Sequence, residues 1–145
     1  MGKVSDILKR KSNQVISVTP DTSVIDALKI MSDKNIGSLL VMVGSTYMGL
    51  MTERDYARKV ILQEKHSDET LVSEIMTTNL PHVSPRDSVE QCMQLMADGN
   101  VRYLPVFEEG VLVGLVSIID VIKEMNELQK ATISHLQDFI SSNYA

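Results

Sequence analysis

Two copies of one short motif contain the side chains of this chain that are best suited to bind a ligand. The first copy runs from Gly49 to Asp55 and the second from Gly114 to Asp120, and each reads glycine, two apolar residues, threonine or serine, two variable residues and aspartate. Open N–H groups at a helix N-terminus attract a phosphate, and a hydroxyl can add a hydrogen bond. The carboxylate can accept bonds from both hydroxyls of a ribose. The motif therefore suits a nucleoside phosphate.

The same spacing also has a purely structural interpretation. A hydroxyl residue followed three positions later by an acidic residue is a capping box, in which both side chains satisfy backbone donors at a helix start. Thr52 with Asp55 and Ser117 with Asp120 fit this description. The duplication does not separate the two interpretations, because both copies inherit whatever use the ancestral motif had.

The motif closes a longer internal repeat. The segment that begins at Val18 aligns without a gap with the segment that begins at Val83. In each copy, apolar residues at i, i+3, i+4 and i+7 predict an amphipathic helix, and two apolar strands and a second helix follow. Ser23 and Ser88 are predicted N-caps, and Gly37 is a predicted stop signal for the first helix.

The predicted fold class is α+β, with mixed helices and strands. Two β-α-β-β-α units, each with a short helical lead-in, should pack face to face with pseudo-twofold symmetry, because one unit has little core by itself. A C-terminal helix follows, with a bend expected near Lys130. We divide the chain into a first unit at residues 1–66, a second at 67–123 and a helical tail at 124–145.

Composition excludes several classes of function. The chain has 145 residues and a net charge of -5, which gives no general attraction to nucleic acid or to an anionic membrane. One cysteine, Cys92, excludes an intramolecular disulfide and indicates a small buried hydrophobe in a reducing compartment, so we expect a cytoplasmic location. The three histidines lack metal-ligand spacing, and no nucleophile and base stand together, so we expect neither a metal site nor an enzyme.

From about Val4 to about Lys123, the lead-ins, the repeat length and both motifs resemble the tandem cystathionine-β-synthase-type (CBS) domain pair, or Bateman module. The chain resembles small stand-alone bacterial signalling proteins of that family. The resemblance implies a regulatory sensor without a catalytic cofactor, which binds AMP, ADP or ATP, or else NAD or S-adenosylmethionine, in two clefts. It also implies a homodimer and a regulated protein that acts in trans.

In such pairs the Thr/Ser-x-x-Asp of one unit meets the lead-in and the start of a strand of the other. The first implied cleft contains Thr52, Arg54, Asp55, Arg58, Pro81, His82, Val101, Arg102 and Tyr103. The second implied cleft contains Ile16, Ile36, Gly37, Ser38, Ser117 and Asp120.

The two clefts differ in charge. Arg102 and Tyr103 stand where the other copy has Gly37 and Ser38, and Arg54 and Arg58 lie about one turn apart. We therefore favour the first cleft for a mononucleotide, and NAD or a second AMP for the other, although these arginines also fit a solvated helix face. The alternative function is a dimerisation scaffold that binds no ligand.

Overall fold

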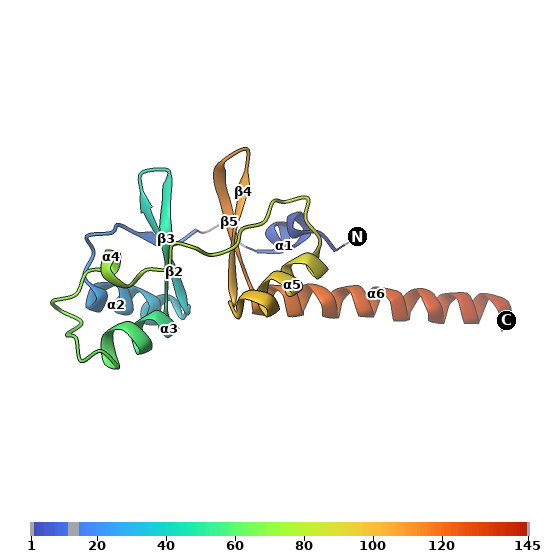
Figure 1. Ribbon diagram of the computed structural model, residues 1–145. Helices are drawn as coiled ribbons and strands as arrows, with labels where there is room; N and C mark the ends of the chain where they lie inside the picture. Colours follow the sequence, from blue (N-terminus) through green and yellow to red (C-terminus); the bar gives the residue numbers. More distant parts are fainter. Residues whose placement is uncertain (1, 12–14, 145) are drawn as a thin grey trace. The chain divides into compact units, whose positions relative to one another are not determined.

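The chain divides into two compact units in a computed structural model, which describes residues 2–11 and 15–144 (Figure 1). Unit 1 comprises Met1–Asn13 and Pro81–Ala145, and unit 2 comprises Gln14–Leu80. Each unit thus joins the lead-in of one repeat to the strands of the other. The units consequently differ from the sequence division at residues 66 and 123, which follows the order of the repeats along the chain.

Unit 2 is a three-stranded sheet with helices. Strand β1 pairs in parallel with β2, and β2 pairs antiparallel with β3 through a register that shifts at Val41/Met42. Gly44, at φ +60°, lies in the two-residue turn of this hairpin, where a positive φ fits the twist of the strands. The elements are β1 (Ser17–Val18), α2 (Val24–Lys34), β2 (Ser38–Val43), β3 (Thr46–Thr52), α3 (Glu53–Tyr56), the π-helix η1 (Ala57–Ile61) and α4 (Val72–Ile75).

Unit 1 repeats the hairpin but not the first strand. Val83 forms only an isolated parallel bridge to Val106 where unit 2 has β1. In unit 2 the N–H of Leu40 donates to the carbonyl of Ile16 at 3.2 Å, whereas the aligned residue in unit 1 is Pro105, which has no N–H. The expected strand is therefore reduced to a bridge. The elements are α1 (Val4–Arg10), α5 (Val89–Gly99), β4 (Tyr103–Glu108), β5 (Val111–Ser117) and α6 (Ile118–Tyr144).

The long helices begin where the sequence predicts. Ser23 accepts a hydrogen bond from the N–H of Asp26 at 3.2 Å, and Ser88 accepts one from the N–H of Gln91 at 3.1 Å, so both predicted N-caps are confirmed. The stop signal is different from the one predicted. Both helices end at asparagines in the left-handed conformation, Asn35 (φ 54°) and Asn100 (φ 50°), and Gly37 lies two residues later.

Each unit has its own apolar core, and the lead-in helices supply part of it. Val4 and Ile7 of α1 are buried with the strands of unit 1, and Val72 and Ile75 of α4 are buried with those of unit 2. Cys92 is fully buried, as predicted, and burial raises the pKa of its thiol to about 11, with a smaller contribution from Asp87.

Helix α6 is one uninterrupted helix, and the bend expected near Lys130 is not present. The hydroxyl of Thr132 donates to the carbonyl of Leu128 at 3.0 Å. A β-branched residue lowers helix propensity only slightly, so it does not break a helix by itself. Among the described residues, no helix combines the length and the apolar character that crossing a membrane requires.

The glycine that opens each motif allows a close approach by a lead-in. A Cβ atom built on Gly49 would lie 2.8 Å from the carbonyl oxygen of Thr77, which accepts a 2.9 Å bond from the N–H of Leu50. A Cβ atom on Gly114 would lie 2.8 Å from Cδ2 of Leu8. The first contact is with backbone and the second with the end of a flexible side chain.

Gly49→Ala should therefore destabilise the protein more than Gly114→Ala. We expect a loss of about 2 kcal/mol for the first, because the backbone at Thr77 must move, and less than about 1 kcal/mol for the second. Urea unfolding at equilibrium measures both. Equal losses would contradict the backbone contact at Gly49.

Candidate functional site

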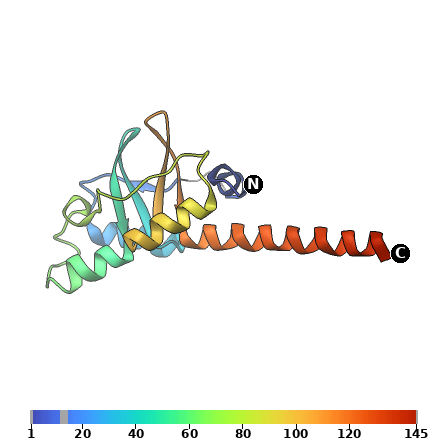
Figure 2. The same ribbon diagram turned by 45° about the vertical axis from the view of Figure 1, so that its right-hand side comes forward.

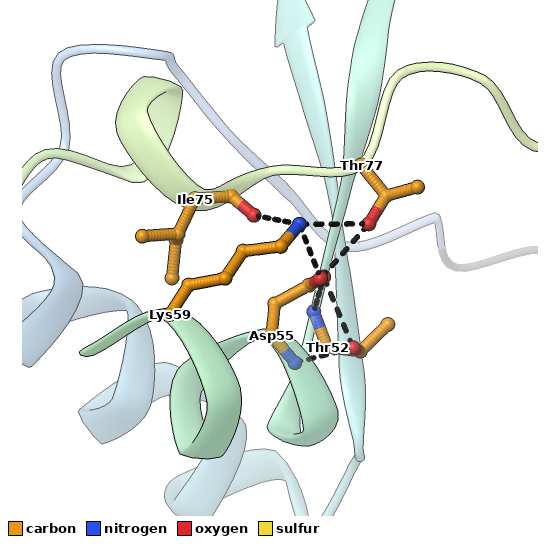
Figure 3. Close-up of polar contacts among 5 residues, drawn as sticks. All are labelled: Thr52, Asp55, Lys59, Ile75 and Thr77. Carbon is orange, nitrogen blue, oxygen red and sulfur yellow. Dashed lines mark hydrogen bonds and ion pairs between the residues drawn. The ribbon is translucent and has the colours of Figure 1, made fainter. Parts of the chain in front are cut away.

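Asp55 has both carboxylate oxygens occupied by donors of its own unit (Figure 3). Its Oδ2 accepts from the N–H and the hydroxyl of Thr52, each at 3.0 Å. Its Oδ1 accepts from the Thr77 hydroxyl at 2.8 Å and lies 2.9 Å from Nζ of Lys59. Asp55 is only 5% exposed. A ligand could use this carboxylate only by displacing one of these donors.

The same contacts attach the second lead-in to the motif. Nζ of Lys59 also donates to the carbonyl of Ile75 at 2.9 Å and to the hydroxyl of Thr77 at 3.4 Å (Figure 3). Lys59 lies four residues after Asp55, and a π-helix begins directly after α3. The capping interpretation thus describes what Asp55 does within unit 2: it closes the capping box with Thr52 and connects α3 to the segment after α4.

Asp120 makes fewer contacts than Asp55. Its Oδ2 accepts from the N–H of Ser117 at 2.8 Å and from Nζ of Lys11 at 2.7 Å. Nζ of Lys11 also donates to the carbonyl of Leu115 at 2.7 Å. Within the described part of the chain, the Oδ1 of Asp120 has no hydrogen-bond partner. The second motif therefore keeps an acceptor for a ligand, and the first does not.

A groove of about 460 Å³ opens beside Asp120 between α1 and α6. Arg10 crosses it, with Nε 3.2 Å from Oε2 of the buried Glu124 in an ion pair that lacks hydrogen-bond geometry. The side chain of Lys123 is exposed, and among the described residues it forms no ion pair. The lining contains four basic and three acidic side chains, namely Arg10, Lys11, Lys123, Lys130, Asp120, Glu124 and Glu127.

A second hollow, of about 610 Å³, lies in unit 2 between the end of α2 and α3. It includes the predicted residues Ile36 and Gly37, but no basic side chain lines it. A phosphate would find no cation there, so this hollow fits the expected ligand less well. Among the described residues, no three His, Cys, Asp or Glu side chains are grouped to hold a metal ion.

The helix that begins inside each motif has its first N–H group bonded to a carbonyl of its own unit. The N–H of Glu53 donates to the carbonyl of Gly37 at 3.1 Å, and the N–H of Ile118 donates to the carbonyl of Arg102 at 2.9 Å. Ser38 lies opposite Thr52 in the β2–β3 ladder, as does Tyr103 opposite Ser117 in β4–β5. Each motif thus adjoins the strand start of its own unit.

The remaining predicted site residues differ in exposure. Arg58, His82 and Arg102 are exposed, and the ring of His82 meets that of Phe107 edge-on at 5.4 Å between centroids. Ser38 is buried. The half-buried members are Ile16, Ile36, Gly37, Arg54, Pro81, Val101 and Tyr103. Since each implied cleft takes residues from both units, the two complete sets stay predictions.

Three residues of these sites were not assigned a role from the sequence. Lys59 could have been found, because a cation four residues after Asp55 on a helix is a standard ion-pair spacing. Lys11 and Thr77 gave no such signal, since they lie 109 and 22 residues from the aspartates that they contact. Only the folded lead-ins bring them to the motifs.

Comparison with known proteins places the chain in a family. The profile of the CBS domain matches residues 4–62 and 72–127. The chain belongs to the CBS-domain family. Both CBS matches include a lead-in, α1 in the first and α4 in the second.

Relatives of the chain are CBS-domain proteins from plants and bacteria. The mitochondrial CBS domain-containing protein CBSX3 of Arabidopsis thaliana is 35% identical over 97% of this chain and 73% of its own length. A solved structure from Burkholderia ambifaria, provisionally assigned to signal transduction, is 46% identical, with a TM-score of 0.82 over 85% of this chain and 93% of its own. A hexameric CBS-CP12 protein of bloom-forming cyanobacteria is 28% identical, with a TM-score of 0.73 over 83% and 66%.

The two motif aspartates should contribute differently to stability. Asp55→Asn replaces one saturated oxygen by an NH2 group, which donates but cannot accept, so we expect a loss of about 1–3 kcal/mol of unfolding free energy. Asp120→Asn can keep its bond from the N–H of Ser117 and should cost less than about 1 kcal/mol, because Lys11 is 36% exposed. Urea unfolding compares them, and a larger loss for Asp120→Asn would contradict this ranking.

Proposed function

We propose that the chain is a regulatory module that binds an adenine nucleotide, with the ribose at Asp120 and the phosphates in the groove between α1 and α6. One observation supports this assignment most strongly: Asp120 lines a groove of about 460 Å³ and keeps one oxygen without a partner in the described structure. A carboxylate with a free acceptor is what the hydroxyls of a ribose need. This proposal therefore places the ligand at the second motif, whereas the charges in the sequence favour the first.

The charges of the groove suit a phosphate. Lys123 is exposed and forms no ion pair among the described residues. Lys11 would exchange its ion pair with Asp120 for one with the phosphate. A phosphate that takes Lys11 from Asp120 leaves that carboxylate to the ribose, so each charged group keeps a partner. This exchange avoids the cost of an unpaired charge in a site that is partly shielded from water.

The same exchange supplies a way to signal. Lys11 is the C-cap of α1 and is the last described residue of α1's segment before unit 2 begins along the chain. A ligand that moves Lys11 away from Asp120 and from the carbonyl of Leu115 therefore acts on the end of a lead-in. A ligand can shift an equilibrium only through contacts that differ between two states, and these two contacts meet that requirement. A partner protein that reads the change acts in trans.

Self-association and a cytoplasmic location complete the proposal. The hexameric CBS-CP12 protein, which aligns with 83% of this chain, supports self-association of the present chain, which we take to be a homodimer. The single buried cysteine supports a reducing compartment. The provisional assignment of the Burkholderia ambifaria relative to signal transduction supports a regulatory role over a catalytic one.

Isothermal titration calorimetry with AMP, ATP, NADH and S-adenosylmethionine tests the ligand. We expect heat with at least one of them, and a loss of affinity of roughly 10- to 100-fold in Asp120→Asn, because a charge-assisted bond is removed. Asp138→Asn is the matched control, since Asp138 is an exposed aspartate of the same helix outside the groove. No heat with any of the four at millimolar concentration would favour the scaffold instead.

Asp55→Asn distinguishes the two motif copies in the same titration. We expect it to lower stability and to retain affinity, because Asp55 is saturated by its own unit. Lost affinity in Asp55→Asn together with normal affinity in Asp120→Asn would return the site to the first motif. Lys11→Met should weaken ATP more than adenosine, and an equal effect on both would contradict the phosphate role of Lys11.

A further inference from the structure

Helix α6 carries a regular row of exposed residues that the nucleotide proposal does not use. Their spacing alternates between three and four residues, as at the a and d positions of a coiled coil. Five of the seven are large and apolar, and each of these five is about half exposed. This row, called the seam below, consists of Ile119, Ile122, Asn126, Gln129, Ile133, Leu136 and Ile140.

The seam faces away from the rest of unit 1. The side of α6 that packs on its own unit is marked by the buried Val121 and Glu124 and the half-buried Met125 and Leu128. At about 100° per residue, the seam lies on the order of 120° around the helix from that side. Asn126 also lines the groove between α1 and α6, at its edge, and the other six seam residues are not among the residues that line it.

The second half of α6 has no contact surface within its own unit. Every residue from 129 to 142 is exposed, and the helix projects beyond α1 and α5 in both views (Figures 1 and 2). Isolated helices of this length are marginal in water, and most helices in proteins are stabilised by burying an apolar face. The exposed Ile133, Leu136 and Ile140 are such a face without a cover in unit 1.

We propose that the seam pairs with the seam of a second copy of this chain, as a parallel, in-register, two-stranded coiled coil. The proposal refines the self-association proposed above and does not depend on the nucleotide. In this register each seam residue meets its own copy, so five layers are apolar. Asn126 and Gln129 also meet their copies, and each amide has both a donor and an acceptor. A different partner would have to supply two matching amides.

Charge favours the parallel orientation over the antiparallel one. An antiparallel pair can also match the amides, with Asn126 opposite Gln129, but it leaves Ile140 without a seam partner. It further places Lys123 of one chain beside Lys130 of the other on the flank of the seam, where like charges repel. In the parallel pair the flanking lysines meet Ile118 and Met125, which are uncharged, so their stems can pack there.

The contact is large enough for a specific dimer. Residues 119 to 140 span about 31 Å of helix at 1.5 Å per residue. A strip of that length and about one helix diameter wide buries on the order of 1,000 Å² over the two chains, which is near the lower limit of specific interfaces. The expected dimer is thus one that forms at micromolar concentration and responds to a few substitutions.

Sedimentation velocity over a concentration series tests the pairing. The variant Ile133→Asp/Leu136→Asp should raise the dimer dissociation constant at least 100-fold, because four charges would enter the seam. The matched control is Ala131→Asp/His135→Asp, which adds two aspartates to exposed positions on the other side of the same helix and should leave the dimer intact. Circular dichroism confirms that both variants fold.

The outcomes separate this inference from the proposed function. The wild-type chain is measured over a 100-fold range of concentrations up to about 0.1 mM, which is above the micromolar dissociation constant expected for a seam of this size. A chain that stays monomeric over this whole range overturns both self-association and the seam. A dimer that persists in the seam variant overturns the seam alone. Nucleotide heat measured on the seam variant reports on the Asp120 site independently of either result.

Cysteine cross-linking determines the orientation. Ile133→Cys and Ile122→Cys are mixed in equal amounts, unfolded together, refolded and oxidised. A parallel seam gives only disulfides between identical variants, because residues 122 and 133 are about 16 Å apart along it and disulfides need Cα atoms within about 7 Å. Mixed disulfides as the main product would overturn the parallel register. The native Cys92 is buried and does not compete.

Discussion

The packing of each lead-in against the motif and the apolar core of its unit is the constraint on which the rest of the molecule depends. In unit 2 Asp55 holds Thr77, and in unit 1 Asp120 holds Lys11. Both contacts require the chain to pass close to the second strand of a hairpin, which the motif glycines at positions 49 and 114 permit. The lead-ins also supply apolar residues to each core, so polar and apolar interactions stabilise the same exchange of segments.

The two copies of the motif differ in how far this contact uses the carboxylate. Asp55 is surrounded by neutral donors and one lysine, and no acceptor is left. Asp120 meets one backbone N–H and one lysine, on a single oxygen. A duplicated structural element has thus kept its capping role in both copies, while only one copy retains the capacity to accept a further donor.

Much of the fold follows from local sequence. The apolar periods, the serine N-caps and the repeat gave the elements of both units, since these features depend on neighbouring residues. The first strand of the second repeat is shorter than expected because Pro105 has no N–H to donate to the neighbouring strand, and that pairing joins residues distant in the chain. Helix α6 likewise continues without interruption past Thr132, so the lower helix propensity of one β-branched residue did not predict a break.

By itself, the sequence determined the duplicated motif, the fold class and the membership of the CBS family, because each of these is written in local spacing that recurs 65 residues later, from Val18 to Val83. The tertiary structure decided which motif is saturated. Lys11 and Thr77 reach the two aspartates from far along the chain, and no local pattern specifies such contacts. It also decided that the seam of α6 faces away from its own unit, because the direction of an apolar row depends on what covers the other sides of the helix.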